Sequence, residues 1–198
     1  MIILSDNSNK MSDTHKHYII SVMAEDRVGI IHDITRTISA MGGDLADTRQ
    51  QVLQGYFSMI LHASFPENLS GQEIVDALTA IEPEHPFEVS VKSVTGPPVD
   101  DPATMKNNYV LTARGSDRIG FVALVSGFCA DHSINILDLS TTTGSDDTYT
   151  MILLVDLSKC PPMEVLRAHL EEFSTNNGLS LLLQHHDIFK ATNEIGMI

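Results

Sequence analysis

The feature that most constrains the fold is an internal repeat. The segment 26–30, Asp-Arg-Val-Gly-Ile, recurs 91 positions later at 117–121 as Asp-Arg-Ile-Gly-Phe. After one extra residue near 144–147, Ser-Met-Ile-Leu at 58–61 is matched by Thr-Met-Ile-Leu at 150–153. Self-similarity at a fixed offset indicates a duplicated structural unit. The length of 198 residues allows two small domains, so we predict two copies of one module.

A proline-rich stretch separates the two copies. The segment 95–104, Thr-Gly-Pro-Pro-Val-Asp-Asp-Pro-Ala-Thr, combines residues that interrupt both helices and strands. The residues before the first copy are mostly polar, and we expect them to be mobile. The sequence therefore predicts a mobile N-terminal tail at 1–15, a first domain at 16–94, a linker at 95–107, a second domain at 108–186 and a C-terminal tail at 187–198.

Each copy has the hydrophobic pattern of a βαββαβ unit. Apolar alternation and β-branched runs predict strands, and apolar spacing of three and four predicts helices. In copy one, Gly42-Gly43 ends the first helix, and Ser70 with Glu73 forms the capping box of the second. We therefore predict an α+β fold of two ferredoxin-like modules, each an antiparallel four-stranded sheet with helices on one face. The modules could bury the other face against each other, or pair edge strands into a continuous sheet.

The charge balance excludes one class of partner. With 12 basic and 26 acidic residues the net charge is −14, whereas nucleic-acid binding needs a basic surface. We therefore expect no direct contact with DNA; the acidity suits solubility, or an acidic face for a basic protein partner. No apolar run is long enough for a membrane span, no signal peptide is evident, and the two cysteines form no CxxC pair. A cytoplasmic protein without membrane contact is expected.

Neither copy carries the sequence signature of a common enzyme class. The sequence has no P-loop, no GxGxxG after a strand, no GxSxG and no HExxH. The catalytic loop of acylphosphatases and the MxCxxC loop of copper chaperones, which share this topology, are also missing. His185 and His186 could suggest metal binding, but neighbouring residues on a strand point to opposite faces. We expect no catalytic residue, no cofactor and no metal.

The repeated loop between the first strand and first helix is the candidate site. Asp26 and Gly29 in copy one, and Asp117 and Gly120 in copy two, occupy this loop. An aspartate there can cap the helix, glycine permits close backbone approach, and exposed amides at a helix N-terminus favour a carboxylate. A capped turn, with glycines required only for close packing, is the alternative interpretation.

The same residues carry a family resemblance. Asp-Arg-Val-Gly-Ile-Ile-His-Asp-Ile at 26–34 resembles the start of an ACT domain, and so does Asp-Arg-Ile-Gly-Phe-Val-Ala-Leu-Val at 117–125, followed by Asn-Ile-Leu-Asp at 135–138. The resemblance covers 17–94 and 108–185. The tandem arrangement without an attached enzyme is similar to the glycine cleavage system transcriptional repressor family. It implies a regulator that binds an amino acid at an interface between modules.

The resemblance also implies the binding residues. The family site uses the loop glycine and the start of the second strand. An aspartate at position 44 would repel a ligand carboxylate but could meet an ammonium group, so copy two, or a site shared by both copies, is expected to bind. The ligand-binding residues predicted in this way are Asp26, Gly29, Asp44, Asp117, Arg118, Gly120 and Asn135.

Partners follow from the same resemblance. Repressors of this family act through a DNA-binding transcriptional activator, so a protein partner of that kind is expected. The polar second strands, at 44–51 and 138–143, are the expected contact edges, across a homodimer or another homo-oligomer. A purely structural or interaction module without a small ligand is the main alternative, and an enzyme of unrecognised type is the third.

Overall fold

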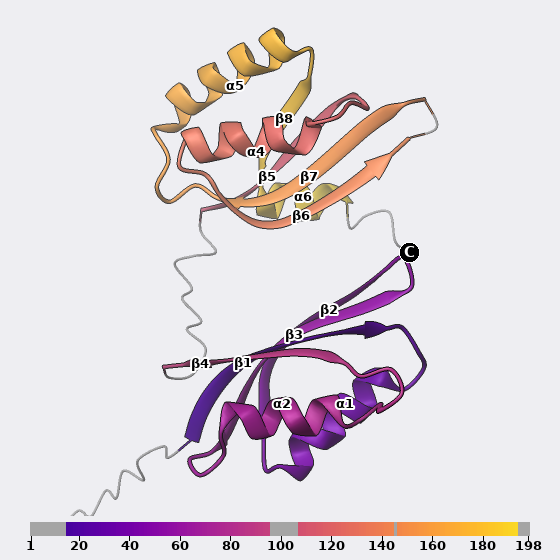
Figure 1. The fold of residues 1–198 in the computed structure, drawn as a ribbon. Coiled ribbons are helices and arrows are strands. Elements are labelled where there is room, and N and C mark those ends of the chain that lie inside the picture. Colours follow the sequence, from indigo (N-terminus) through magenta and orange to yellow (C-terminus); the bar gives the residue numbers. More distant parts are fainter. Residues whose placement is uncertain (1–14, 96–106, 145, 194–198) are drawn as a thin grey trace, which may run out of the picture. The chain divides into compact units, whose positions relative to one another are not determined.

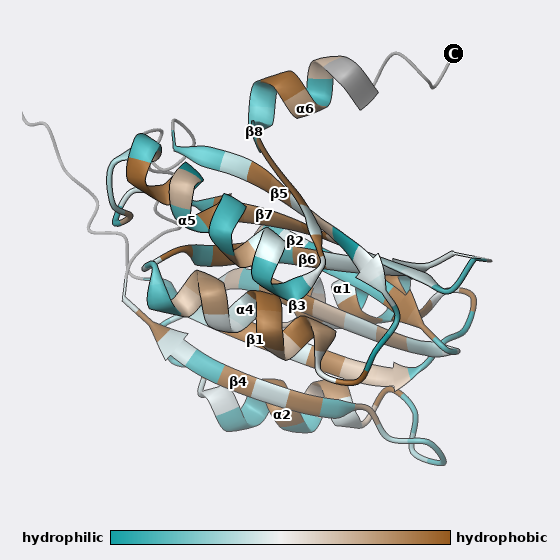
Figure 2. Ribbon diagram, turned by 90° about the horizontal axis from the view of Figure 1, so that it is seen from above, coloured by the Kyte–Doolittle hydropathy of each residue, from teal (hydrophilic) through white to brown (hydrophobic). Residues whose placement is uncertain are grey.

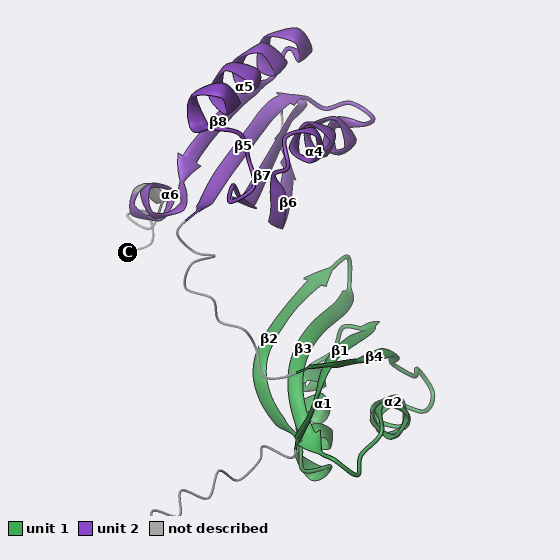
Figure 3. Cartoon of the chain, turned by 90° about the vertical axis from the view of Figure 1, so that its left-hand side faces the viewer, with its two compact units in different colours: residues 1–99 green, residues 100–198 purple. Residues whose placement is uncertain are grey.

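The computed structural model describes residues 15–95, 107–144 and 146–193. The chain divides into two compact units, residues 1–99 and 100–198, coloured separately in Figure 3. The predicted N-terminal tail, apart from its last residue, and most of the predicted linker lie outside the described residues. Each unit contains one copy of the repeat, and we describe the two units as separate modules.

The first module is a four-stranded antiparallel sheet covered by two helices on one face (Figure 1). The strand order is β2-β3-β1-β4, so the first strand lies between the third and the fourth. The elements are β1 (His15–Glu25), α1 (Ile30–Ala40), β2 (Asp44–Leu53), β3 (Tyr56–Pro66), α2 (Gly71–Thr79) and β4 (Glu88–Val94).

The second module repeats this topology with the order β6-β7-β5-β8. One further helix, α6, contacts β5 and β8 and lies on the side of the sheet opposite α4 and α5 (Figure 1). It falls mostly within the stretch predicted as a C-terminal tail. The elements are β5 (Asn108–Ser116), α4 (Phe121–Asp131), β6 (Asn135–Thr143), β7 (Thr148–Asp156), α5 (Met163–Asn177), β8 (Ser180–His185) and α6 (His186–Asn193).

These modules confirm the predicted fold, two ferredoxin-like βαββαβ units. The repeat extends to irregularities of the backbone. Both second strands carry a bulge two residues after their start, at Ala46 and at Leu137. The loop residue Asp26 donates its amide to Gly55 O at 2.8 Å, and Asp117 donates to Asp147 O at the same distance. Within the described residues, no helix has both the length and the apolar character needed to cross a membrane.

Each module has its own hydrophobic core between its sheet and its helices. The stripe on α1, Ile30, Ile34 and Ile38, is buried as its spacing predicts. Apolar and polar residues alternate along β4, which packs one face inward (Figure 2). The capping box is present as well: the Ser70 amide donates to Glu73 Oε2 at 2.8 Å, and the Glu73 amide donates to Ser70 Oγ at 3.3 Å.

At one corner, the two cores have their large and small side chains at different positions. Gly43 follows α1, and a Cβ built on it would lie 2.5 Å from the Phe65 ring and 2.7 Å from Ile38 Cγ2. The residue at the same place in the second module is Ile134, which is buried. Its module has the smaller residues Leu157 and Cys129 in place of the phenylalanine and isoleucine. A large side chain therefore stands at a different position in each core, and the summed side-chain volume of the three positions is similar in the two modules.

Candidate functional site

The two strand-to-helix loops have the same backbone. Gly29 and Gly120 are the N-cap residues of α1 and α4, with φ of 88° and 86°, and neither helix has a side-chain cap. The suggestion that Asp26 and Asp117 cap these helices is therefore wrong, because the glycines occupy the cap positions. The first amide of each helix donates to a loop carbonyl, Ile30 N to Arg27 O at 3.4 Å and Phe121 N to Arg118 O at 3.2 Å. The remaining first-turn amides have no side-chain cap, so both helix N-termini present donors that no side chain satisfies.

The reason for glycine in these loops is conformational. A Cβ at Gly120 would meet nothing within 4 Å, and one at Gly29 would only reach the end of the Arg27 side chain at 4.0 Å. Close packing, the alternative interpretation, is therefore not what requires glycine here. The left-handed φ does, since only glycine adopts it without steric cost.

The arginines of the two loops have different surroundings. In the first module, Arg27 pairs with Asp33 at 2.8 Å and with Glu82 at 2.7 Å, and its guanidinium lies 5.9 Å from the centre of the Phe87 ring. The hydrogen bond that Arg27 donates to the Asp33 carboxylate is the main cause that raises the pKa of Arg27. In the second module, Arg118 is exposed, and its guanidinium donates one bond of 3.3 Å to the Asn177 carbonyl. The second loop therefore retains a guanidinium without an acidic partner among the described residues.

The structure separates the predicted residues of each module into two groups. Glu25, at the loop end of β1, pairs with Tyr56, whereas Asp44 pairs with Ser64, eight residues further along β3. Eight residues of strand span about 26 Å. Asp117, Arg118 and Gly120 are separated from Asn135 in the same way, since Ser116 pairs with Thr148 and Asn135 with Asp156. Within one module, the loop glycine and the second-strand residue cannot contact the same small ligand.

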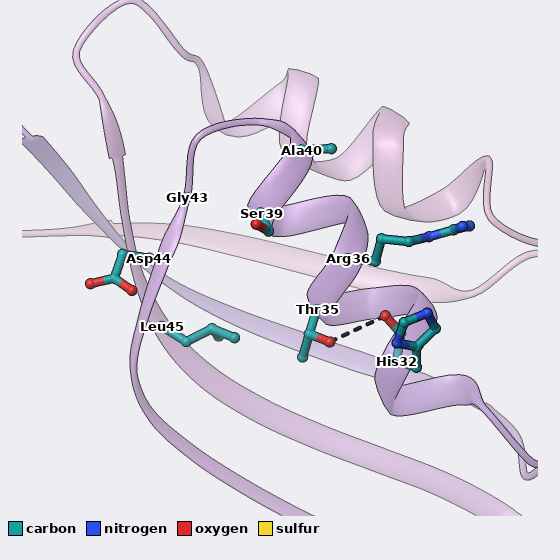
Figure 4. A pocket seen from close by; sticks show the side chains of 8 residues that line it. All are labelled: His32, Thr35, Arg36, Ser39, Ala40, Gly43, Asp44 and Leu45. Atoms are coloured by element: carbon teal, nitrogen blue, oxygen red, sulfur yellow. Dashed lines mark hydrogen bonds between the residues drawn. The ribbon is translucent and has the colours of Figure 1, made fainter.

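Asp44 instead lies beside a groove along the outer face of α1. The groove has a volume of about 640 Å³, and its lining comes from α1 and from the start of β2 (Figure 4). Thr35 donates its hydroxyl to the His32 carbonyl at 3.1 Å, and Arg36 extends away from Asp44. The groove thus carries a carboxylate at one end and a guanidinium on its helical wall. The lining residues are His32, Thr35, Arg36, Ser39, Ala40, Gly43, Asp44 and Leu45.

A second groove, between α4 and α5, was not predicted. It has a volume of about 580 Å³ and combines aromatic, acidic and histidine side chains. His132 and His169, which come from different helices, lie in hydrogen-bond contact with a ring N···N distance of 2.9 Å. Their separation of 37 positions gives no periodic signal, and neither side chain belongs to a motif.

The tail histidines do not assemble a metal site. His185 ends β8 and His186 begins α6, and Asp187 Oδ2 lies 3.5 Å from His185 Nδ1. Across the described parts of the chain, no group of three His, Cys, Asp or Glu side chains has an arrangement that could hold a metal ion. Cys129 is buried in α4, where burial raises the pKa of its thiol to about 11.

Comparison with known families identifies the modules. Residues 16–92 match the family model of the ACT domain, so the first module belongs to the class that the loop motif indicated. With the same topology in its second half, the chain is an ACT-domain protein with two ACT-like modules.

The chain belongs to the UPF0237 family. The UPF0237 protein of Neisseria meningitidis serogroup B is 44% identical over 91 residues, which are 99% of that protein and 45% of this chain. The UPF0237 protein of Clostridium perfringens is 37% identical over 89 residues, 99% of that protein and 44% of this chain. These relatives therefore correspond in length to a single module, and their names state no activity.

Two solved structures match both modules. A crystal structure of an unknown protein from Galdieria sulphuraria has a TM-score of 0.69 and 25% identity, covering 86% of this chain and 98% of that one. A protein assigned as a glycine cleavage system transcriptional repressor has a TM-score of 0.66 and 18% identity, covering 86% and 96%. The second likeness establishes a shared fold.

Proposed function

We propose that this chain is a non-catalytic regulator that binds a free amino acid and transmits its binding through protein–protein contacts. The observation that carries the proposal is the loop present in both modules, where a left-handed glycine begins a helix whose first amides no side chain caps. Those amides, at the positive end of a helix dipole, suit the carboxylate of an amino acid.

The second module is the better candidate for the carboxylate contact. Its loop places the exposed guanidinium of Arg118 two residues before Gly120, while Arg27 is engaged by two carboxylates. Asn135 replaces the charged Asp44 at the start of the second strand, so a ligand carboxylate meets no like charge there. Arginine and amide donors are the usual protein partners of a carboxylate.

The proposed site is completed by a module of a second copy of the chain. This follows from the separation of about 26 Å between the loop and the second-strand start within one module. A ligand that contacts the loop of one module and Asn135 of another stabilises one arrangement of modules over others. Binding can shift that balance only by the difference in affinity between the arrangements.

The proposed output is regulation of a protein partner. A structure with the same fold is assigned as a glycine cleavage system transcriptional repressor, and a net charge of −14 disfavours direct contact with DNA. We therefore propose transcriptional regulation through a protein such as an activator, in the cytoplasm and by a homo-oligomer.

Calorimetric titration of the full chain with the twenty common amino acids tests the proposal. We expect saturable binding of one amino acid or a few related ones, and weaker binding by Gly120→Ala, whose new Cβ forces a side chain into a left-handed conformation. Gly55→Ala is the matched control, since Gly55 has φ of 81° and equally open surroundings in a turn of the other module. No binding across the panel, or equal loss in both variants, would contradict the proposed site.

An interaction module without a small ligand is the second candidate. The observation that favours it is an exposed apolar group on the uncovered face of the first sheet. Leu53 pairs with Tyr56 across the hairpin, and Met23 and Ile60 are exposed on the same face. Exposed apolar patches commonly mark protein contacts. If no amino acid binds, this face is the place to search for a partner.

A further inference from the structure

The groove between α4 and α5 has an aromatic floor. The ring of Phe128 lies 4.6 Å from that of Phe173, between ring centres, and stacks on the His132 ring at 4.1 Å with an angle of 23° between planes. Phe128 comes from α4 and Phe173 from α5, so the floor joins the two helices. At about 580 Å³, the groove lies within the usual range for small-molecule sites.

Gly127 keeps the groove open. It lies within α4, where glycine is among the least favourable residues, and a Cβ there would meet nothing within 4 Å. Neither a packing constraint nor a positive φ explains this glycine. The residue at the same position of the first module is Arg36, whose long side chain lines the surface there. Glycine in the second module leaves the partly exposed Phe173 ring accessible, beside Phe128, which is itself only 5% exposed.

A histidine pair fixes one end of the groove. His132 Nδ1 lies 2.9 Å from the Phe128 carbonyl, which can only accept, so this nitrogen carries a proton. In neutral His132, Nε2 is therefore an acceptor, and His169 Nδ1 donates to it at 2.9 Å. These two bonds hold the His132 ring against Phe128.

The charge of the lining is negative. Asp131 and Glu172 line the groove, one from each helix, and no lysine or arginine is among the lining residues. An anionic ligand would meet these two carboxylates, whereas the Arg118 guanidinium reaches the groove only from outside its lining, at the Asn177 carbonyl 3.3 Å away. A ligand with a flat apolar ring and a positive charge matches both the aromatic floor and the two carboxylates of the lining. A cation also interacts favourably with aromatic faces.

We propose that the α4–α5 groove is a second small-ligand site, for aromatic amines in their protonated form. The ring lies against Phe173, beside the stacked Phe128 and His132 rings, in the space above Gly127, and the ammonium group meets Asp131 or Glu172. The groove adjoins the loop, since Arg118 donates to the carbonyl of the lining residue Asn177, but its aromatic residues lie outside the loop and it does not depend on a second module.

Tryptamine and indole-3-propionate form a matched pair of probes, with the same ring and linker and opposite charges. We expect the full chain to bind tryptamine with a dissociation constant of about 0.1–2 mM, as its number of atoms allows, measured by NMR titration. Indole-3-propionate should bind at least tenfold more weakly. Equal binding of both probes, or no saturation by 10 mM tryptamine, would overturn the proposal.

Two variants locate the site. Gly127→Leu fills the groove with a good helix former and should lower tryptamine affinity at least tenfold, while Ala168→Leu, on an exposed position of α5 outside the lining, should leave it unchanged. Glu172→Gln keeps the shape and should lower affinity about two- to fivefold, as expected for an exposed ion pair. Gly120→Ala should leave tryptamine binding unchanged, which separates this site from the loop. Native affinity in Gly127→Leu would refute the assignment.

Discussion

Gly43→Ala is expected to destabilise the first module by about 1–3 kcal/mol, the usual cost of overpacking a core. The added Cβ would lie 2.5 Å from Phe65 Cε1, 2.7 Å from Ile38 Cγ2 and 2.9 Å from the Ile38 carbonyl oxygen. Carbon atoms in favourable contact lie about 3.5–4.0 Å apart, so all three neighbours are too close. The carbonyl belongs to the end of α1 and already accepts the Gly43 amide at 2.9 Å, so it cannot move away freely.

Hydrogen exchange measured by mass spectrometry on the full chain resolves the two modules. A loss of about 2 kcal/mol corresponds to about 30-fold faster exchange of the most protected amides in β1 and β3. It also corresponds to a Tm of the module lowered by about 8–16 °C. Peptides from β5 and β7 provide the internal reference and should exchange at the native rate.

Two further variants test the cause of this loss. Adding Phe65→Leu to Gly43→Ala should restore part of the stability, because the second module has a leucine at the corresponding place. Gly127→Ala, where the new Cβ has no neighbour within 4 Å, should instead stabilise α4 by about 1 kcal/mol. Native exchange rates in Gly43→Ala would refute the packing described for this corner.

Three other perturbations have defined outcomes. Ser70→Ala removes the capping box and should lower the stability of the first module by about 0.5–2 kcal/mol in urea unfolding; an unchanged midpoint would show that the cap contributes nothing. Burial lowers the pKa of His62 below its ordinary 6.5, so the unfolded chain takes up the proton first and stability should fall as pH drops below about 6.5. His62→Leu should flatten that fall between pH 7 and 5, and an identical pH dependence would contradict this origin. Iodoacetamide at pH 8 should modify the partly exposed Cys160 before Cys129, whose buried thiol has a pKa of about 11; mass spectrometry showing equal labelling of the native protein would argue against this burial.

The fold could be predicted because its signals are local and occur twice. The buried stripe of α1, its end before Gly42-Gly43 and the Ser70 capping box follow from spacing and residue type, and the structure contains each of them. The repeat then supplied the second module by analogy. The sequence predicts only a tail where helix α6 lies, because its eight residues contain too few apolar positions to give a clear period.

The candidate sites were harder to predict because they depend on contacts between distant residues. The residue type of Asp26 predicts a capping role, but the cap position belongs to Gly29. The contact between His132 and His169 depends on how α4 lies beside α5, which the sequence pattern of neither helix contains. Residue types therefore indicated which loop could bind a ligand. The two grooves can be recognised only when the packing of the helices is known.

The different placement of large and small side chains in the two cores also affects how the chain can fold. Duplicated domains on one chain risk misassembly, in which a strand enters the wrong copy. If β3 entered the second module, Phe65 would meet Ile134, and two large side chains would compete for the space of one. If the segment with Leu157 entered the first module, it would leave a cavity beside Gly43. Both errors are destabilising, so the divergence of the two cores directs each strand back to its own module.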